Sequence, residues 1–228
     1  MTLSPLRAAV LLSVALVPIA PAVLDSDAGA VAGPVNYEVS ITNLTYQQIM
    51  SPAVVATHTP DFAFWRLGSP ASPELAMIAE DAVNGPMMAM LGARPEVGDV
   101  QVVAGAGGPI MPGETAKVTI CAEDGRDTLS LAGMLVVTND AFYGLNSQRL
   151  PGRGVRSFSS PAYDAGSEAN TEDCAHIPGP PCGSPMVRVT AGAEGFVHIH
   201  RGLQGVGTLD ETTLDWRNPV ARISVRRL

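Results

Sequence analysis

The sequence predicts a mainly β protein, an antiparallel β-sandwich with a short helical insertion. The first observation is a strict alternation of apolar and polar residues, as in Tyr37, Val39 and Ile41 and the polar residues between them. In a strand this period of two places the apolar set on one face. The second observation is that many short segments of this kind are separated by turns containing Gly or Pro, which is typical of antiparallel sandwiches.

The strands follow from these two patterns. Alternation recurs at residues 116–122, 187–189 and 221–225. Apolar, β-branched and aromatic residues predict further strands at 53–57, 62–66, 100–104, 129–138 and 196–201.

One segment between the early strands has helical periodicity instead. Ser72 is a suitable N-cap, and a proline and an acid follow it in the first turn. Leu75 and Ile78 then share one face. Asn84-Gly85 should end this helix, and residues 86–91 predict a second short helical turn.

Composition and charge limit the class of protein. The chain has 228 residues, of which 46% are hydrophobic, so it can bury a sizeable core. Its net charge of −8 disfavours nucleic acid as a partner, because that interaction relies on Lys and Arg against phosphate.

Residues 1–30 are predicted to be a secretory signal peptide, followed by a spacer over residues 31–35. Arg7 supplies a positive charge, and the apolar run that follows it is too short to span a bilayer. Small residues that suit cleavage occur at Ala20-Pro21-Ala22 and at Ala28-Gly29-Ala30, of which the second is preferred. An uncleaved membrane anchor is the alternative.

Signal cleavage would make the protein secreted and extracellular, or periplasmic in a bacterium with two membranes. In such an oxidising compartment Cys174 and Cys182, which lie close together in a loop rich in Pro and Gly, are expected to form a disulfide. Cys121 is then left as a free, partly buried thiol.

Several short sequence motifs are spread over nearly the whole mature chain. The most informative are MLVVTNDAF at 134–142, YDAGSE at 163–168, IPGP at 177–180, GFVHIHRG at 195–202 and DWRNPVA at 215–221. In content and order they resemble the spondin domain, the N-terminal module type of F-spondin and mindin, which also occurs alone in bacterial secreted proteins. The resemblance implies one spondin-like domain over residues 36–228.

The same resemblance implies a sandwich related to calcium- and lipid-binding domains, with one Ca²⁺ at a loop end. The matching positions for its ligands are Asp140, Asp164 and Glu168. In the animal proteins the third is typically Asp, whereas the longer Glu168 could reach the ion, even bidentately. The animal modules serve adhesion and matrix recognition.

The residues themselves suit this chemistry, since Ca²⁺ prefers six to eight oxygen ligands. Asp140 follows the strand expected to end at Thr138, and Asn139 beside it offers another oxygen. Asp164 and Glu168 flank a turn with Gly166, which would bring the two acids together. The alternative is that these acids are solvated or cap turns.

His198 and His200 form a second candidate site. Residues two apart on a strand point to the same face, and such a pair can begin a zinc or iron site that His58 or Glu80 would complete. Two hydrogen-bonded histidines on a sheet face are the alternative, and the absence of a defined third ligand favours it.

The sequence therefore predicts a secreted calcium-binding module that acts in binding or adhesion at a cell surface or in extracellular matrix. It is not expected to be an enzyme. No Gly-x-Ser-x-Gly string and no phosphate-binding glycine loop occurs, so no catalytic residue is assigned. The expected partner is an extracellular protein or polysaccharide, and membrane contact is not indicated. The alternative function is a metal-dependent enzyme that uses His198 and His200 with a transition metal.

Overall fold

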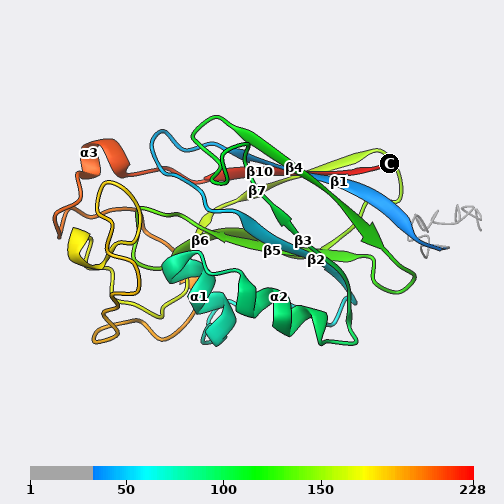
Figure 1. Ribbon diagram of the computed structural model, residues 1–228, viewed down its shortest axis with the longest axis horizontal. Helices are drawn as coiled ribbons and strands as arrows, with labels where there is room; N and C mark the ends of the chain where they lie inside the picture. Colours follow the sequence, from blue (N-terminus) through cyan, green and yellow to red (C-terminus); the bar gives the residue numbers. More distant parts are fainter. Residues whose placement is uncertain (1–32) are drawn as a thin grey trace, which may run out of the picture.

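Two antiparallel sheets pack face to face in the computed structural model, which describes residues 33–228 (Figure 1). This arrangement confirms the predicted antiparallel β-sandwich with a short helical insertion. The expected signal peptide, residues 1–30, and the start of the spacer lie outside the described residues.

The smaller sheet has four strands in the order β4-β1-β10-β7. They are β1 (Val35–Asn43), β4 (Thr115–Ala122), β7 (Val155–Ser160) and β10 (Ala221–Arg227). Val39 of β1 lies opposite Val118 on one side and Val225 on the other, so alternate residues of this sheet face the core as the sequence predicted.

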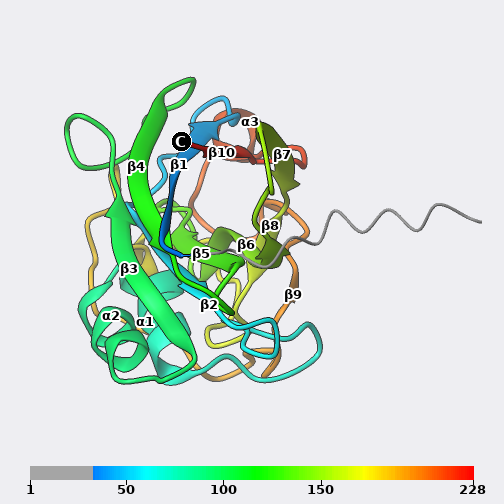
Figure 2. The ribbon, with the colours of Figure 1, turned by 90° about the vertical axis from the view of Figure 1, so that its right-hand side faces the viewer.

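The larger sheet has six strands in the order β3-β2-β5-β6-β8-β9. They are β2 (Ala53–His58), β3 (Val97–Val103), β5 (Thr128–Met134), β6 (Ala141–Arg149), β8 (Ala162–Asp164) and β9 (His198–Ile199). At one edge of the sandwich β3 lies beside β4, where Asp99 Oδ2 accepts a hydrogen bond of 2.9 Å from the Cys121 amide (Figure 2).

Both faces of the larger sheet are buried, which the expectation of one-sided strands missed. Every residue of β2 and of β5 is buried. Val55 packs into the core between the sheets, whereas Val54 belongs to a second apolar cluster on the opposite face. A strand covered on both faces is apolar throughout, so its sequence shows no alternation.

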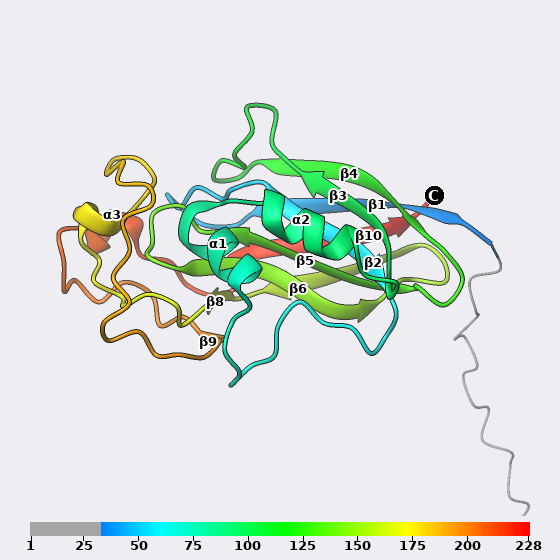
Figure 3. The same cartoon turned by 60° about the horizontal axis from the view of Figure 1, so that its bottom comes forward.

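Two helices cover this outer face, in front of β2, β5 and β6 (Figure 3). They are α1 (Pro73–Asp81) and α2 (Gly85–Gly92), and they lie between β2 and β3 as expected. The predicted N-cap is confirmed, because Ser72 Oγ accepts a hydrogen bond of 3.2 Å from the Leu75 amide. Leu75 and Ile78 are fully buried against the sheet.

Two expected strands are wrong. Residues 187–189 form no strand. Arg188 instead forms ion pairs with Glu80 and Asp81 at the end of α1. Residues 62–66 form a loop that places Phe64 and Trp65 in the outer apolar cluster. Phe64 and Trp65 are apolar because they cover the outer face of the sheet, whereas Val187 is 48% exposed.

Three strands, β6, β7 and β8, are not among those predicted from the sequence. β6 is buried on both faces at its start, and β7 is an edge strand whose residues are mostly exposed. Neither environment requires alternating apolar and polar residues, so the pattern gave no signal.

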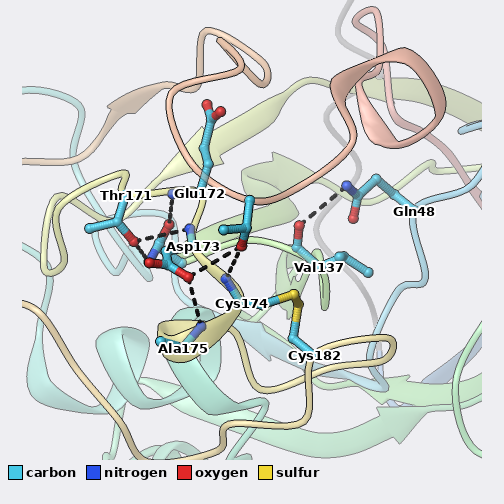
Figure 4. The surroundings of a disulfide bond; sticks show 10 residues. Gln48, Val137, Thr171, Glu172, Asp173, Cys174, Ala175 and Cys182 are labelled. Carbon is cyan, nitrogen blue, oxygen red and sulfur yellow. Dashed lines mark hydrogen bonds between the residues drawn. A yellow bond between two sulfur atoms is a disulfide. The ribbon is translucent and has the colours of Figure 1, made fainter.

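Long loops gather at one end of the sandwich, at the left of Figure 1. They include the short helices η1 (Cys174–His176) and α3 (Glu211–Leu214). Figure 4 shows the Cys174–Cys182 disulfide among these loops, and Cys121 is the free cysteine, so both expectations are confirmed. Within residues 33–228, no helix has the length and apolar character needed to cross a membrane.

The close packing of β6 gives a test of this three-layer arrangement. A Cβ on Gly144 would lie 2.5 Å from the Leu131 carbonyl oxygen and 2.7 Å from the Trp65 ring. Gly144→Ala should therefore lower the free energy of unfolding by about 1–3 kcal/mol, measured by urea denaturation. Gly107→Ala is the control, since nothing lies within 4 Å of its added Cβ. Equal stability of both variants would contradict the packing described.

Candidate metal centre

Two neighbouring strands of the larger sheet place the predicted acids at the same end of the sandwich. Asp140 immediately precedes β6, and Asp164 is the last residue of β8, which pairs with β6 through Ala141 and Asp164. Glu168 follows in the loop after β8. All three side chains are buried, with exposed fractions of 0%, 1% and 2%.

Only one of the two oxygens of the Asp140 carboxylate is hydrogen-bonded to this loop. Its Oδ2 accepts hydrogen bonds from the backbone amides of Ser167, at 2.8 Å, and Glu168, at 3.0 Å. Its Oδ1 is buried and has no hydrogen-bond partner, and the same holds for Oε2 of Glu168. Two carboxylate oxygens at this end are thus removed from water without a donor, which is costly for a charged group.

Burial dominates the electrostatics of these acids. It raises the pKa of Asp140 well above its usual value, and the nearby Asp164 carboxylate raises it further, although the two amide hydrogen bonds oppose the change. Burial also raises the pKa of Glu168 to about 7, followed by repulsion from Glu80, while the Arg188 guanidinium acts in the opposite direction.

Glu168 therefore lies between Asp140 and the ion pairs at the end of α1. Arg188 Nε is 2.6 Å from Glu80 Oε2, and an Arg188 terminal nitrogen is 3.0 Å from Asp81 Oδ2. The Glu80 carboxylate is thus engaged by Arg188, and it does not complete a histidine site as one sequence hypothesis allowed.

The Asp164 carboxylate lies close to the imidazole rings of His198 and His200. Its Oδ1 is 3.6 Å from His198 Nε2, and its Oδ2 is 3.8 Å from His200 Nε2. Both imidazoles point to the same side, as the spacing predicted. Gly166 and Asn170 also donate to Asp164, at 2.8 Å from the Gly166 amide and 2.7 Å from the Asn170 side chain.

His200 has no free nitrogen for a metal. The Gly202 amide donates to its Nδ1 at 3.0 Å, so the proton of the neutral ring is on Nε2, which donates to Asn170 Oδ1 at 2.9 Å. Burial lowers the pKa of His200 to about 4, which keeps the ring neutral at pH 7. His58 is also engaged elsewhere, by Ser130 and Thr59. His200 is thus hydrogen-bonded, as the favoured alternative in the sequence had it, and the hypothesis of a paired-histidine metal site loses one of its two ligands.

The compact group of metal-ligating atoms in residues 33–228 is Asp164, Glu194 and His198, whose ligand atoms all lie within 4.8 Å of one another. Asp140 and Glu168 are not members of this group. Glu194 was not among the residues predicted from the sequence, although Gly195 after it is a turn signal that is consistent with a return of the chain toward Asp164.

The comparisons with known proteins add no identification. No family model matches the chain, and no curated protein gives a significant match. The resemblance to spondin domains therefore stays an expectation drawn from the sequence.

The raised pKa values predict how the stability of the calcium-free protein depends on pH. Glu168 has a usual pKa of 4.5 and one of about 7 in the folded chain, so the folded state binds its proton more tightly than the unfolded state. The free energy of unfolding should therefore fall as pH rises from about 4.5 to 7, and Asp140 acts in the same direction.

Urea denaturation in the presence of a chelator, at several pH values across this range, measures the effect. Glu168→Gln should flatten the dependence, whereas Asp124→Asn, at an exposed turn near the opposite end of β5, should leave it unchanged. Stability that increases over this range would show that Glu168 is not held in an unfavourable environment.

Proposed function

We propose that the chain is a secreted, non-enzymatic binding module that holds one calcium ion at the loop end of its sandwich. The observation that carries the proposal is the pair of buried carboxylate oxygens without donors, Asp140 Oδ1 and Glu168 Oε2. Asp164, which adds to the repulsion at Asp140, is the third expected ligand.

A cation fits these oxygens better than protons do. A protonated carboxyl group still needs an acceptor for its O–H, and neither orphaned oxygen has a hydrogen-bond partner. A divalent ion would use both as ligands and would reverse the repulsion between the acids. Oxygen-only ligation with flexible coordination is the preference of Ca²⁺, and Asn139 and loop carbonyls are further oxygen sources.

The proposed role of the ion is to fix the loops that carry recognition. It would join the start of β6 to the loop after β8, which is already attached to it through Asp140. A hollow of about 530 Å³ at the same end is lined in part by Tyr46, Trp216 and Arg217. Trp216 is buried and Arg217 is paired with Asp215, whereas Tyr46 is exposed, and an exposed aromatic side chain suits an extracellular protein or polysaccharide as the partner.

The alternative of an enzyme with a paired His198 and His200 metal site loses its support, because both nitrogens of His200 are engaged. We therefore propose no catalytic role for that pair.

Calcium should stabilise the folded chain, because it binds the folded state preferentially. At about a hundred times Kd the gain is roughly 2.7 kcal/mol, or about 5–10 °C in melting temperature for a domain of this size. Chelator should remove this gain from the wild type. Asp140→Asn should melt at nearly the same temperature with calcium and with chelator, as measured by differential scanning calorimetry.

The matched control is Asp124→Asn, which removes an exposed carboxylate from a turn at the opposite end of β5 and should keep the wild-type calcium shift. A wild-type melting temperature that is the same in calcium and in chelator would disprove the calcium site.

Export should remove the N-terminal segment between Ala20 and Ala32, because a charged start, a short apolar run and small residues mark a signal peptide. Intact-mass spectrometry of protein recovered outside the cytoplasm measures the cleavage position. Recovery of a chain that still begins at Met1 would contradict the secreted assignment.

A further inference from the structure

A second site lies beside the proposed calcium site and uses different chemistry. Asp164, Glu194 and His198 offer two carboxylate oxygens and one imidazole nitrogen within 4.8 Å of one another. They come from two segments, the end of β8 and the residues that lead into β9.

The tautomer of His198 directs a lone pair into this group. Its Nδ1 lies 3.0 Å from the Ile199 carbonyl oxygen, which can only accept, so Nδ1 carries the proton of the neutral ring. The unprotonated Nε2 then faces Asp164 Oδ1 at 3.6 Å. Nε2 is buried and has no hydrogen-bond partner.

Two lone pairs that face each other at this distance indicate a place for a cation. Zinc bonds of about 2.0–2.2 Å to nitrogen and oxygen in a tetrahedron separate the two ligand atoms by about 3.3 Å. The observed separation needs little adjustment. A metal-binding histidine usually donates its other ring N–H to a carbonyl or carboxylate, as His198 does to Ile199.

Asn170 is hydrogen-bonded to the carboxylates of both Asp164 and Glu194. Its side-chain amide donates to Asp164 Oδ2 at 2.7 Å and to Glu194 Oε1 at 3.3 Å. Its own oxygen is fixed by the proton on His200 Nε2. His200 therefore positions Asn170, and Asn170 orients the two acids.

A close backbone contact brings the two segments together. Gly166 has a φ of +65°, and a Cβ there would lie 2.4 Å from the Phe196 carbonyl oxygen and 2.6 Å from its amide nitrogen. The Gly195 amide also donates to the Gly166 carbonyl at 2.8 Å. Only glycine permits this approach, which places Glu194 and His198 beside Asp164.

We propose that Asp164, Glu194 and His198 form a binding site for zinc or a similar divalent transition-metal ion. Imidazole nitrogen together with carboxylate suits these ions and disfavours Ca²⁺, which prefers oxygen alone. With three protein ligands, a fourth position is left for water or for a ligand in the adjoining cavity of about 210 Å³, which Asp164 and His200 also line.

This site goes beyond the proposed calcium function and shares only Asp164 with it. The orphaned oxygens that support calcium belong to Asp140 and Glu168. Variants at Glu194 and His198 therefore report on zinc, and Asp140→Asn reports on calcium.

Calorimetric titration of the exported protein with zinc chloride, in excess calcium, tests the proposal. All proteins would carry Cys121→Ser, because a free thiol also binds zinc. We expect one zinc ion per chain. His198→Ala and Glu194→Gln should each weaken binding by at least about tenfold, since the loss of even an outer partner costs roughly 10–100-fold.

His176→Ala is the matched control, because this loop histidine lies outside the group and should leave zinc affinity unchanged. Circular dichroism and the calcium-dependent melting shift of each variant show that the fold is kept. Nitrogen-15 NMR provides a second readout: zinc should shift the resonance of His198 Nε2 and leave Nδ1 protonated.

Absence of stoichiometric zinc binding, or undiminished binding by His198→Ala, would overturn the proposal. Zinc binding without a calcium-dependent melting shift would reject the calcium function and keep this site, and the reverse result would do the opposite.

Discussion

The buried Asp140 carboxylate is the constraint on which the loop end of the sandwich depends. One of its oxygens accepts the amides of Ser167 and Glu168, which attaches the loop after β8 to the start of β6. The strand pairing of Ala141 with Asp164 brings the second acid beside it. Burial of like charges this close is unfavourable without a cation. The loop end therefore combines a fixed backbone with an uncompensated charge, and this combination is the basis of the proposed calcium site.

The helical layer also contributes charges close to the loop end of the sandwich. Because the larger sheet is covered on both faces, α1 ends close to the loop after β8, and its Glu80 and Asp81 hold Arg188. Glu80 repels the Glu168 carboxylate, and Arg188 attracts it. The one cation near Glu168 in the described ion pairs is thus shared among three acids. The Arg188 side chain and the Met186 amide both contact Asp81 at the end of the helix, and Glu168 keeps a raised pKa.

The sequence predicted the parts whose environment leaves a pattern. The smaller sheet has one face in the core, so alternation identified β1, β4 and β10, and local capping at Ser72 identified α1. β6 and β8 left no such pattern, because one is buried on both faces and the other has three residues. Asp140, Asp164 and Glu168 were found through the spondin resemblance and the turn at Gly166. Glu194 was missed because its place depends on the contact of Gly166 with Phe196, 30 residues apart, which no local spacing encodes.

The two proposed ions are kept apart by the way each carboxylate oxygen is used. On Asp140 the donors fill Oδ2 and leave Oδ1 without a partner. On Asp164 the Asn170 amide fills Oδ2, whereas Oδ1 accepts the Gly166 amide and also faces His198. His200 contributes to this arrangement, since its Nε2 donates to Asn170 and its Nδ1 accepts from Gly202. Neither nitrogen is then available as a metal ligand. A neutral His200 is thus a structural requirement of the proposed site, and burial, which lowers its pKa to about 4, keeps the ring neutral at pH 7.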